Sequence, residues 1–280
     1  MPIFETPEPI TAVIEITAGR VQINASDRAD TVVDVRPRDE TRDIDVHAAE
    51  QTQVEYAGGQ LSVRAPKNKL RSLLGRPPSI EVTIEVPSDS RVDAKGWADY
   101  RSEGRIGESS FDTAAGNIRL DQTGGLKLRT AAGNVSVGRS NGHTDVSTSS
   151  GKIWIGEIDG AAVVKTANGD ITVGEVTDDV RLNTANGDIT VHRALAAVSA
   201  KTAFGGVRIG EVVRGTVVLE TSFGELELGV REGTAAWLDV NSQHGSVRSD
   251  LEASDGPEAS ADTVKVRART GYGDIVIRRP

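Results

Sequence analysis

Two aspartates one repeat apart are the best candidates for chemistry in this chain. Asp170 and Asp188 follow Asn-Gly pairs in two identical segments, TANGDITV, and stacked coils would place them about 5 Å apart. A carboxylate pair at that separation suits a retaining glycosidase. The same position in neighbouring segments carries mixed residue types: Asn117, Asn134, Lys152, Gly206 and Glu225. We therefore expect a solvated outer row and a protein that is not an enzyme.

The sequence also contains no recognisable motif for metal or cofactor binding. There is no cysteine, which excludes thiolate catalysis, disulfides and cysteine-ligated metals. The histidines have no metal-ligand spacing: His47, His143, His192 and His244. The Asn-Gly-Asp segments differ from the nonapeptide of calcium-binding β-rolls, in which consecutive turns share the ion. We predict no metal, no cofactor and no catalytic residue.

Charge and hydropathy restrict the partners and the location. With 32 basic and 41 acidic residues the formal net charge is −9, which repels phosphate backbones, so we expect no nucleic-acid partner. The N-terminal residues lack a basic head and a continuous apolar stretch, and nowhere do 18 apolar residues follow one another. We expect a cytoplasmic protein with no integral membrane segment, present as a monomer or a weak dimer.

An internal repeat is the strongest signal in the sequence. Segments of the type TxxGxIxV recur at steps of 17, 18, 18, 18, 18 and 19 residues. Their shared glycines are Gly116, Gly133, Gly151, Gly169, Gly187, Gly205 and Gly224. Two weaker copies surround Gly245 and Gly273 after longer steps of 21 and 28 residues. A period of this kind is typical of a solenoid.

Each repeat predicts two short strands and a glycine corner. Ile189 and Val191 alternate with Asp188 and Thr190, the period of a half-buried strand. One coil cannot bury both strands alone, so its apolar residues must stack on those of neighbouring coils. The glycine suits a corner with positive φ, and the Thr or Ser three residues earlier can hydrogen-bond the turn backbone. We predict an all-β fold, a single-stranded parallel β-helix (β-solenoid) with about 18 residues per coil, and the usual crossover preference favours a right-handed wind. Three hexads of a left-handed helix are the alternative, although the apolar positions do not keep a period of six.

The flanks divide the chain into two parts that we expect to pack as one continuous unit. Residues 1–90 lack the glycine-centred repeat but alternate well, which predicts a β-rich N-terminal cap. Residues 91–280 form the solenoid, with residues 249–263 as a polar surface loop. We expect the last copy, ending in Arg278, Arg279 and Pro280, to close the far end. The basic and apolar segment Lys67–Arg76 could fold onto the cap or contact a partner or membrane.

One corner position collects aromatic residues. Immediately before the glycine, Asn168 and Asn186 give way to Phe204, Phe223, His244 and Tyr272. We expect these side chains to stack from coil to coil and, together with a separate candidate, Trp154, to form an interaction surface. Alternatively, they could only seal the corner.

The repeats resemble the bacterial DUF4097 family, and their style is similar to actinobacterial members. The resemblance rests on the TxxGxIxV units, on the lead-in IEVTIEVPSDSRVDAKGWADYRSEGRIG and on the opening PEPITAVIEITAGRVQINASDRADTVVDVRP. The resemblance covers nearly the whole chain. It implies a protein built of β-strand repeats with an adhesin-like role, and it assigns no catalytic residues to this sequence.

These observations favour a non-enzymatic solenoid that acts as a rigid interaction or scaffold surface for an unknown protein or polysaccharide partner. Two alternatives remain open: a carbohydrate-active β-helix enzyme that uses the exposed acidic row, and an exported surface adhesin.

Overall fold

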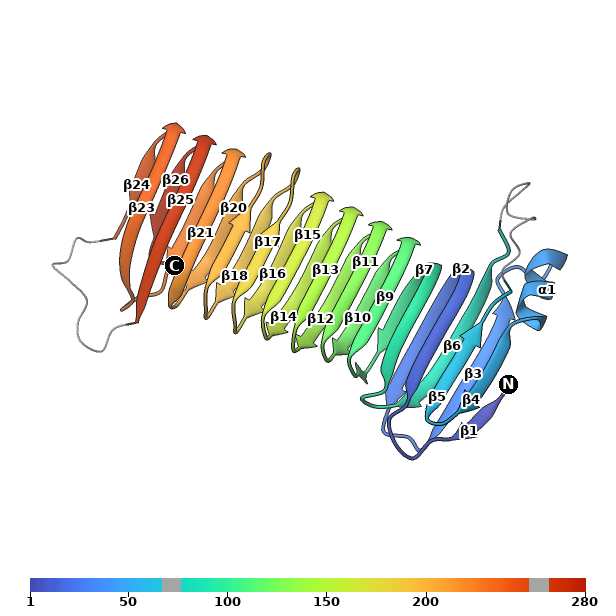
Figure 1. The fold of residues 1–280 in the computed structure, drawn as a ribbon. Helices are drawn as coiled ribbons and strands as arrows, with labels where there is room; N and C mark the ends of the chain where they lie inside the picture. The colour runs from blue at the N-terminus through green and yellow to red at the C-terminus, as the bar shows by residue number, and fades with distance from the viewer. Residues whose placement is uncertain (67–76, 252–261) are drawn as a thin grey trace. The chain divides into compact units, whose positions relative to one another are not determined.

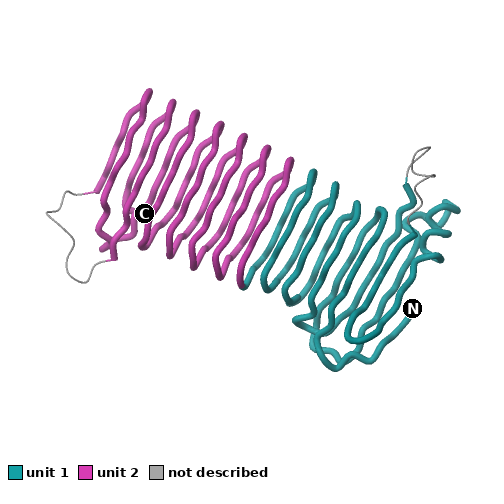
Figure 2. Tube along the Cα trace, in the orientation of Figure 1, with its two compact units in different colours: residues 1–141 teal, residues 142–280 magenta. Residues whose placement is uncertain are grey.

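The computed structural model describes residues 1–66, 77–251 and 262–280. The segment Lys67–Arg76 lies outside the described residues, as do residues 252–261 of the predicted surface loop. The chain forms two compact units, residues 1–141 and 142–280 (Figure 2). The domain limits expected at residues 90 and 91 stay a prediction.

Among its described residues, unit 1 combines one helix with twelve strands. The helix is α1(Asp43–Glu50), and the strands are β1(Ile3–Glu5), β2(Thr11–Ser26), β3(Asp30–Pro37), β4(Gln53–Ala57), β5(Gln60–Arg64), β6(Ile80–Pro87), β7(Arg91–Glu103), β8(Arg105–Ile106), β9(Ser109–Ala115), β10(Ile118–Thr123), β11(Leu126–Ala132) and β12(Val135–Asn141).

Unit 2 consists of fourteen strands among its described residues. They are β13(Thr144–Ser150), β14(Ile153–Asp159), β15(Ala162–Asn168), β16(Ile171–Val176), β17(Val180–Asn183), β18(Ile189–Ala194), β19(Val198–Lys201), β20(Val207–Val212), β21(Gly215–Phe223), β22(Leu226–Val230), β23(Ala235–His244), β24(Val247–Ser249), β25(Thr263–Tyr272) and β26(Ile275–Arg278).

The predicted fold class is confirmed, because strands one coil apart pair in parallel with like positions aligned (Figure 1). In unit 2, Ile171 aligns with Ile189, and Ile189 aligns with Val207. All three side chains point inward and are at most 1% exposed. A single coil could not bury the apolar side chains of its two strands, so stacking on neighbouring coils provides their burial.

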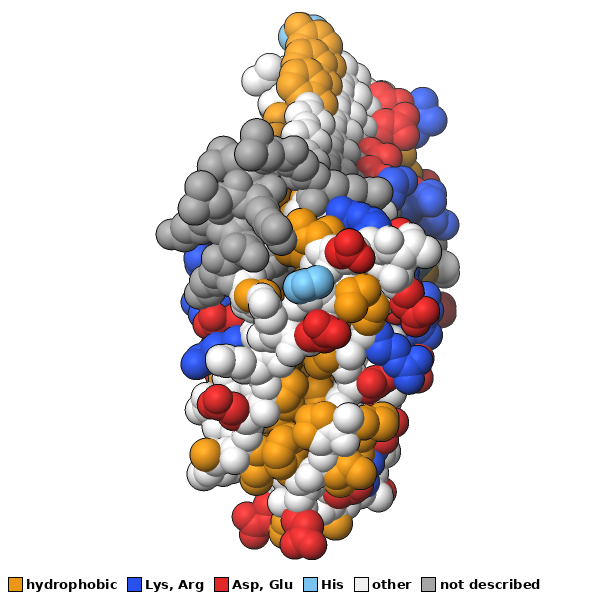
Figure 3. All heavy atoms as spheres, turned by 90° about the vertical axis from the view of Figure 1, so that its right-hand side faces the viewer, with side chains coloured by type: hydrophobic (Ala, Val, Ile, Leu, Met, Phe, Trp, Pro, Cys, Tyr) orange, Lys and Arg blue, Asp and Glu red, His pale blue; other side chains and the backbone are white. Residues whose placement is uncertain are grey.

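The N-terminal part of unit 1 confirms the predicted β-rich cap. Strands β2 and β7 form long parallel neighbours, whereas β3 pairs antiparallel with β6, and β1 pairs antiparallel with β3. Strand β4 pairs antiparallel with β5, which in turn pairs parallel with the first residues of β2, and α1 contacts β3. Figure 3 looks onto this end, where hydrophobic side chains lie between acidic and basic ones. Its edge strands are short, which limits pairing with other chains.

The repeat begins earlier than the sequence predicts. Gly19 and Gly96 adopt φ values of 145° and 143°, like the corner glycines of the later coils. The copy at Thr17–Ile23 reads TAGRVQI, one residue shorter than TxxGxIxV. Because of this missing residue, the segment does not match the repeat pattern, and the sequence does not reveal that a coil starts inside the first 90 residues.

The expected closure by the last copy is wrong, because the final repeat lies inside unit 2. Strand β25 pairs with β21 on one side and with β23 on the other, while β26 lies between β22 and β24. The coil of β23 and β24 is therefore terminal, although the coil of β25 and β26 follows it in sequence. The longer steps of 21 and 28 residues reflect this exchange of order.

Side chains at the corners hydrogen-bond the neighbouring coil. Thr184 Oγ1 donates to the Gly169 carbonyl oxygen at 3.1 Å, and Thr202 Oγ1 donates to the Gly187 carbonyl oxygen at 3.0 Å. The prediction of a bond to the turn of the same coil holds for Thr113 and Thr130, which donate to the Ala115 and Ala132 carbonyl oxygens, but Thr184 and Thr202 bond the turn of the preceding coil instead. These bonds satisfy hydroxyl groups that are at most 8% exposed, so burying them costs little.

Candidate interaction surface

The four aromatic corner residues of unit 2 form one continuous stack, which we call the aromatic ladder: Phe204, Phe223, Tyr272 and His244. Ring centroids lie 5.1 Å apart for Phe204 and Phe223, 4.9 Å apart for Phe223 and Tyr272, and 4.4 Å apart for Tyr272 and His244. Successive ring planes differ by only 2°, 2° and 7°. The predicted stacking is confirmed, with Tyr272 before His244 because of the exchanged coil order.

The ladder follows directly from the corner geometry. Each ring stands directly before the corner glycine of its coil. Isolated parallel β-bridges align this position from coil to coil, joining Asn186 to Phe204 and Phe204 to Phe223. One coil spacing of about 4.8 Å falls within the range of centroid separations that offset-stacked rings adopt, about 4.5–7 Å. In the preceding coils the same corner holds Asn168 and Asn186, whose side chains hydrogen-bond at 2.9 Å.

The ladder is exposed to solvent. Phe204, Phe223 and Tyr272 are 56%, 46% and 50% exposed, and His244 is also exposed. Neighbouring rings cover one another's faces, so the ladder presents mainly ring edges. Aromatic edges carry partial positive charge, and they attract carbonyl oxygens, carboxylates and the faces of other aromatic rings.

A groove runs beside the ladder over the outer face of β17, β19, β21, β25 and β23. Phe223 and Tyr272 line one side, and the polar residues of the floor include Asn241 and Gln243. Lys201 Nζ lies 2.8 Å from Glu220 Oε2 within the same groove. The groove thus offers an aromatic wall beside paired charges and free amide groups.

The charges at the terminal coil are likewise paired. Asp239 accepts hydrogen bonds from Arg269 Nη2 at 2.7 and 2.8 Å, and Arg267 Nε lies 3.5 Å away. Hydrogen bonding by Arg269 holds the pKa of Asp239 below its usual range. This carboxylate is therefore ionised and neutralised by its neighbours at pH 7.

The structure places Trp154 apart from the ladder. It lies on the outer face of β14, aligned with Thr172 of β16, and is 47% exposed. Among the described residues it makes no ring contact with the ladder. The candidate surface therefore divides into one ladder and one isolated tryptophan.

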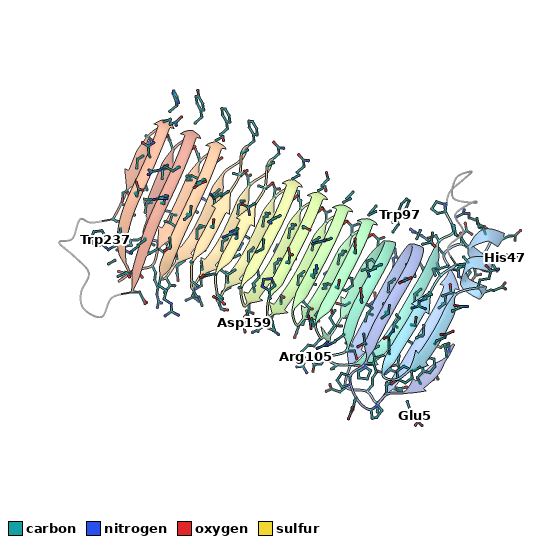
Figure 4. All side chains as sticks on the ribbon, in the orientation of Figure 1. Glu5, His47, Trp97, Arg105, Asp159 and Trp237 are labelled. Carbon is teal, nitrogen blue, oxygen red and sulfur yellow. The ribbon has the colours of Figure 1, made fainter. Side chains whose placement is uncertain are left out.

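Sequence reasoning missed three exposed apolar residues on the terminal coil. Trp237, Leu238 and Val247 are 62%, 38% and 44% exposed. Leu238 follows the inward alternation of the repeat, so the pattern predicts that it is covered by another coil. The unequal step lengths were the only signal of the exchanged order. Figure 4 shows Trp237 beside the end of unit 2.

The acidic row has a structural use. Asp170 Oδ1 accepts the backbone N–H of Asp188 at 3.1 Å, and Asp188 Oδ1 accepts that of Gly206 at 2.7 Å. Asp170 also pairs with Lys152 Nζ at 3.0 Å, and the hydrogen bond from Lys152 lowers the pKa of Asp170. A general acid needs a raised pKa, so the environment of Asp170 opposes that role.

Two further features concern the described residues: metal-ligand clusters and membrane-spanning helices. Within residues 1–66, 77–251 and 262–280, no three His, Asp or Glu side chains cluster as metal ligands. No helix in those ranges is long and apolar enough to cross a membrane.

The fold and this surface define a class of protein: a β-solenoid repeat protein with an exposed aromatic corner. The sequence model described as Toastrack DUF4097 matches residues 11–278, so the chain belongs to the DUF4097 family. This confirms the resemblance seen in the repeats. No curated protein matches the chain.

Solved structures that match the chain are distant in sequence. A "putative adhesin" from Bacteroides fragilis is 11% identical, with 100% of this chain and 95% of that chain covered and a TM-score of 0.39. A "putative lipid binding protein" from Parabacteroides distasonis is 14% identical, with 98% and 95% covered and a TM-score of 0.43. A "putative adhesin" from the same species is 12% identical, with 98% and 95% covered and a TM-score of 0.36.

Proposed function

We propose that this protein is a non-enzymatic interaction module and that the aromatic ladder binds a protein partner. The observation that carries the proposal is the exposure of three stacked rings, at 46–56%, on one corner. The whole sequence contains only three Trp, three Tyr and four Phe, so three on one corner is a marked concentration. Exposed aromatic clusters typically supply the energetic centre of protein interfaces.

The fold does not require rings at this corner. Asn168 and Asn186 occupy the same position in neighbouring coils and close it by a side-chain hydrogen bond of 2.9 Å. The strands on both sides of these asparagines keep the same register. Asparagine would therefore be sufficient to close the corner. The presence of aromatic residues there favours a role in binding.

The geometry of the ladder favours a protein over a polysaccharide. Sugar rings pack against aromatic faces, but here each interior face is covered by the next ring at 4.4–5.1 Å. The exposed edges suit carbonyl oxygens, carboxylates and aromatic side chains of a polypeptide. The groove beside the ladder supplies Asn241 and Gln243, whose amides can pair with a peptide backbone.

Binding through the ladder is tested by a triple variant that keeps the corner chemistry of the fold. Phe204→Asn, Phe223→Asn and Tyr272→Asn convert the ladder into the corner already present at Asn168 and Asn186. We expect partners captured from lysate of the source cell by the wild type to be lost by this variant, with an unchanged thermal midpoint. The matched control is Trp154→Thr, which removes an exposed aromatic elsewhere and copies Thr172. Equal capture by the ladder variant and the wild type would contradict the proposal.

Two other functions have their own tests. A carbohydrate-active enzyme would need Asp170 and Asp188. Loss of a detected glycosidase activity in an Asp170→Asn, Asp188→Asn variant would therefore support the enzyme.

An exported adhesin would be found in culture supernatant or on the cell surface, whereas the proposed cytoplasmic location requires the protein in the soluble cell fraction.

A further inference from the structure

The first strands of unit 1 and the last strands of unit 2 differ in how they are covered. In unit 1, the antiparallel strands β1, β3 and β4 and helix α1 cap the N-terminal coils. In unit 2, the terminal strand β23 pairs only with β25, and β24 pairs only with β26, among the described residues. One side of each terminal strand therefore presents free backbone N–H and C=O groups.

The terminal strands also expose side chains that belong to a core. Leu238 and Val247 are 38% and 44% exposed, whereas their neighbours one coil inward, Val266 and Ile275, are 3% and 1% exposed. The register assigns both exposed residues to inward-facing positions. This is the cross-section of a hydrophobic core left open at its end.

The edge carries few of the devices that normally prevent strand pairing. Strand β23 is ten residues long and contains no proline or lysine, and its pairing with β25 shows no register shift. Its one acidic residue, Asp239, is neutralised by Arg267 and Arg269. Natural sheet proteins usually shorten, bulge or charge such an edge.

We propose that this end joins to the same end of a second copy of the chain, with β23 pairing antiparallel to β23 of the other copy. A two-fold axis perpendicular to the sheets reverses strand direction, so each edge meets an identical edge. Leu238 and Val247 of both copies then complete a shared core.

Charge and size both suit a second copy. The two edge strands carry one acidic residue, Asp239, and one basic residue, Arg248, so their charges sum to zero and the edge can meet an identical edge without net repulsion. Ten residues at about 3.3 Å each, over a width of about 15–20 Å, give roughly 500–650 Å² per copy. The total of roughly 1,000–1,300 Å² reaches the size of a specific interface. Residues 252–261, EASDGPEASA, contain no Val, Ile, Leu or aromatic residue that could replace the missing core.

The association state of the intact chain tests this proposal. At about 100 μM, a concentration that reveals even weak dimers, we expect sedimentation equilibrium to give twice the chain mass of 29.6 kDa. Leu238→Lys with Val247→Lys places like charges face to face across the two-fold axis and should raise the dissociation constant about tenfold or more. The matched control, Val163→Lys with Val218→Lys, adds the same charges to outer positions of internal strands and should dimerise as the wild type does.

Hydrogen exchange of the wild type keeps the test independent of variant folding. We expect amides of β23 and β24 to exchange more slowly as the protein concentration rises. A monomeric mass at about 100 μM, or an edge variant that dimerises as tightly as the wild type, overturns the proposal. The ladder variant should still dimerise, so loss of partner binding and loss of dimerisation are separate outcomes.

Discussion

Single residues at the corners determine whether coils can stack. Gly205 adopts φ 143°, and a Cβ atom there would lie 2.2 Å from the Gly187 carbonyl oxygen. Gly206, the next residue, has no such φ, and its Cβ would lie 3.2 Å from the nearest atom, the Glu225 carbonyl oxygen. The sequence already distinguishes the two, because Gly205 occupies the repeated position and Gly206 a variable one. It does not show the clash itself, which comes from the carbonyl oxygen of the adjacent coil.

The adjacent glycines provide a matched pair for measurement. We expect Gly205→Ala to lower the free energy of unfolding by about 3 kcal/mol or more, from backbone strain and the clash with the adjacent coil. Gly206→Ala should cost about 1 kcal/mol or less. Urea unfolding of both variants checks the difference, and equal losses would contradict the assigned corner geometry.

Asp170 should make a small, pH-dependent contribution to stability. Its lowered pKa, caused first by the hydrogen bond from Lys152, means that the folded state favours the carboxylate. The contribution is therefore present above the pKa of the unfolded state and is lost as the pH falls through the folded-state pKa.

A pair of substitutions separates the charge of Asp170 from its hydrogen bond. Asp170→Asn keeps an acceptor for Asp188 N–H, as Asn117 does for Asn134 at 3.0 Å. This substitution should lower the free energy of unfolding at pH 7 by only about 0.5 kcal/mol, because the exposed ion pair is weak. It should also make the free energy of unfolding fall less steeply as the pH is lowered, because the titrating carboxylate is gone. Asp170→Val also removes the acceptor and should cost about 1 kcal/mol more. If both variants unfold identically at pH 7, the structural role of the acidic row is wrong.

At the scale of elements, the strands were readable from the sequence but their order was not. Alternation places Val217, Leu238 and Val266 correctly on inward positions, yet it contains no information on which strand lies next to which. The exchange of β23 and β25 depends on backbone pairing between coils and on a connection through residues 252–261. The exposed edge could therefore be recognised only from the structure.

Engineered cysteines can test the coil order, since the chain has no cysteine of its own. Val218 aligns with Arg267 of β25, and Arg267 aligns with Asp239 of β23. Paired strands are about 4.8 Å apart, which permits a disulfide, whereas a separation of two strands, about 9.6 Å, does not. Val218→Cys with Arg267→Cys should cross-link on oxidation, and Val218→Cys with Asp239→Cys should not. The reverse result would restore the sequential order.

At the scale of the whole molecule, the family and the repeat architecture follow from the sequence, whereas the binding surface does so only in part. The aromatic ladder was predictable because its members share one repeat position. Its exposure was not, because the 249–263 segment could have covered the corner. The role of Trp154 and the partner of the ladder stay predictions.

Hydroxyl-radical footprinting of the protein, alone and with a partner captured by the wild type, tests the central claim most directly. Oxidation of Phe204, Phe223 and Tyr272 reports their solvent exposure, and Trp154 and Trp97, at 47% and 60% exposed, serve as internal references. We predict that binding lowers oxidation of the three ladder residues and leaves both tryptophans unchanged. Undiminished oxidation of the ladder in the complex would contradict its role as the interaction surface.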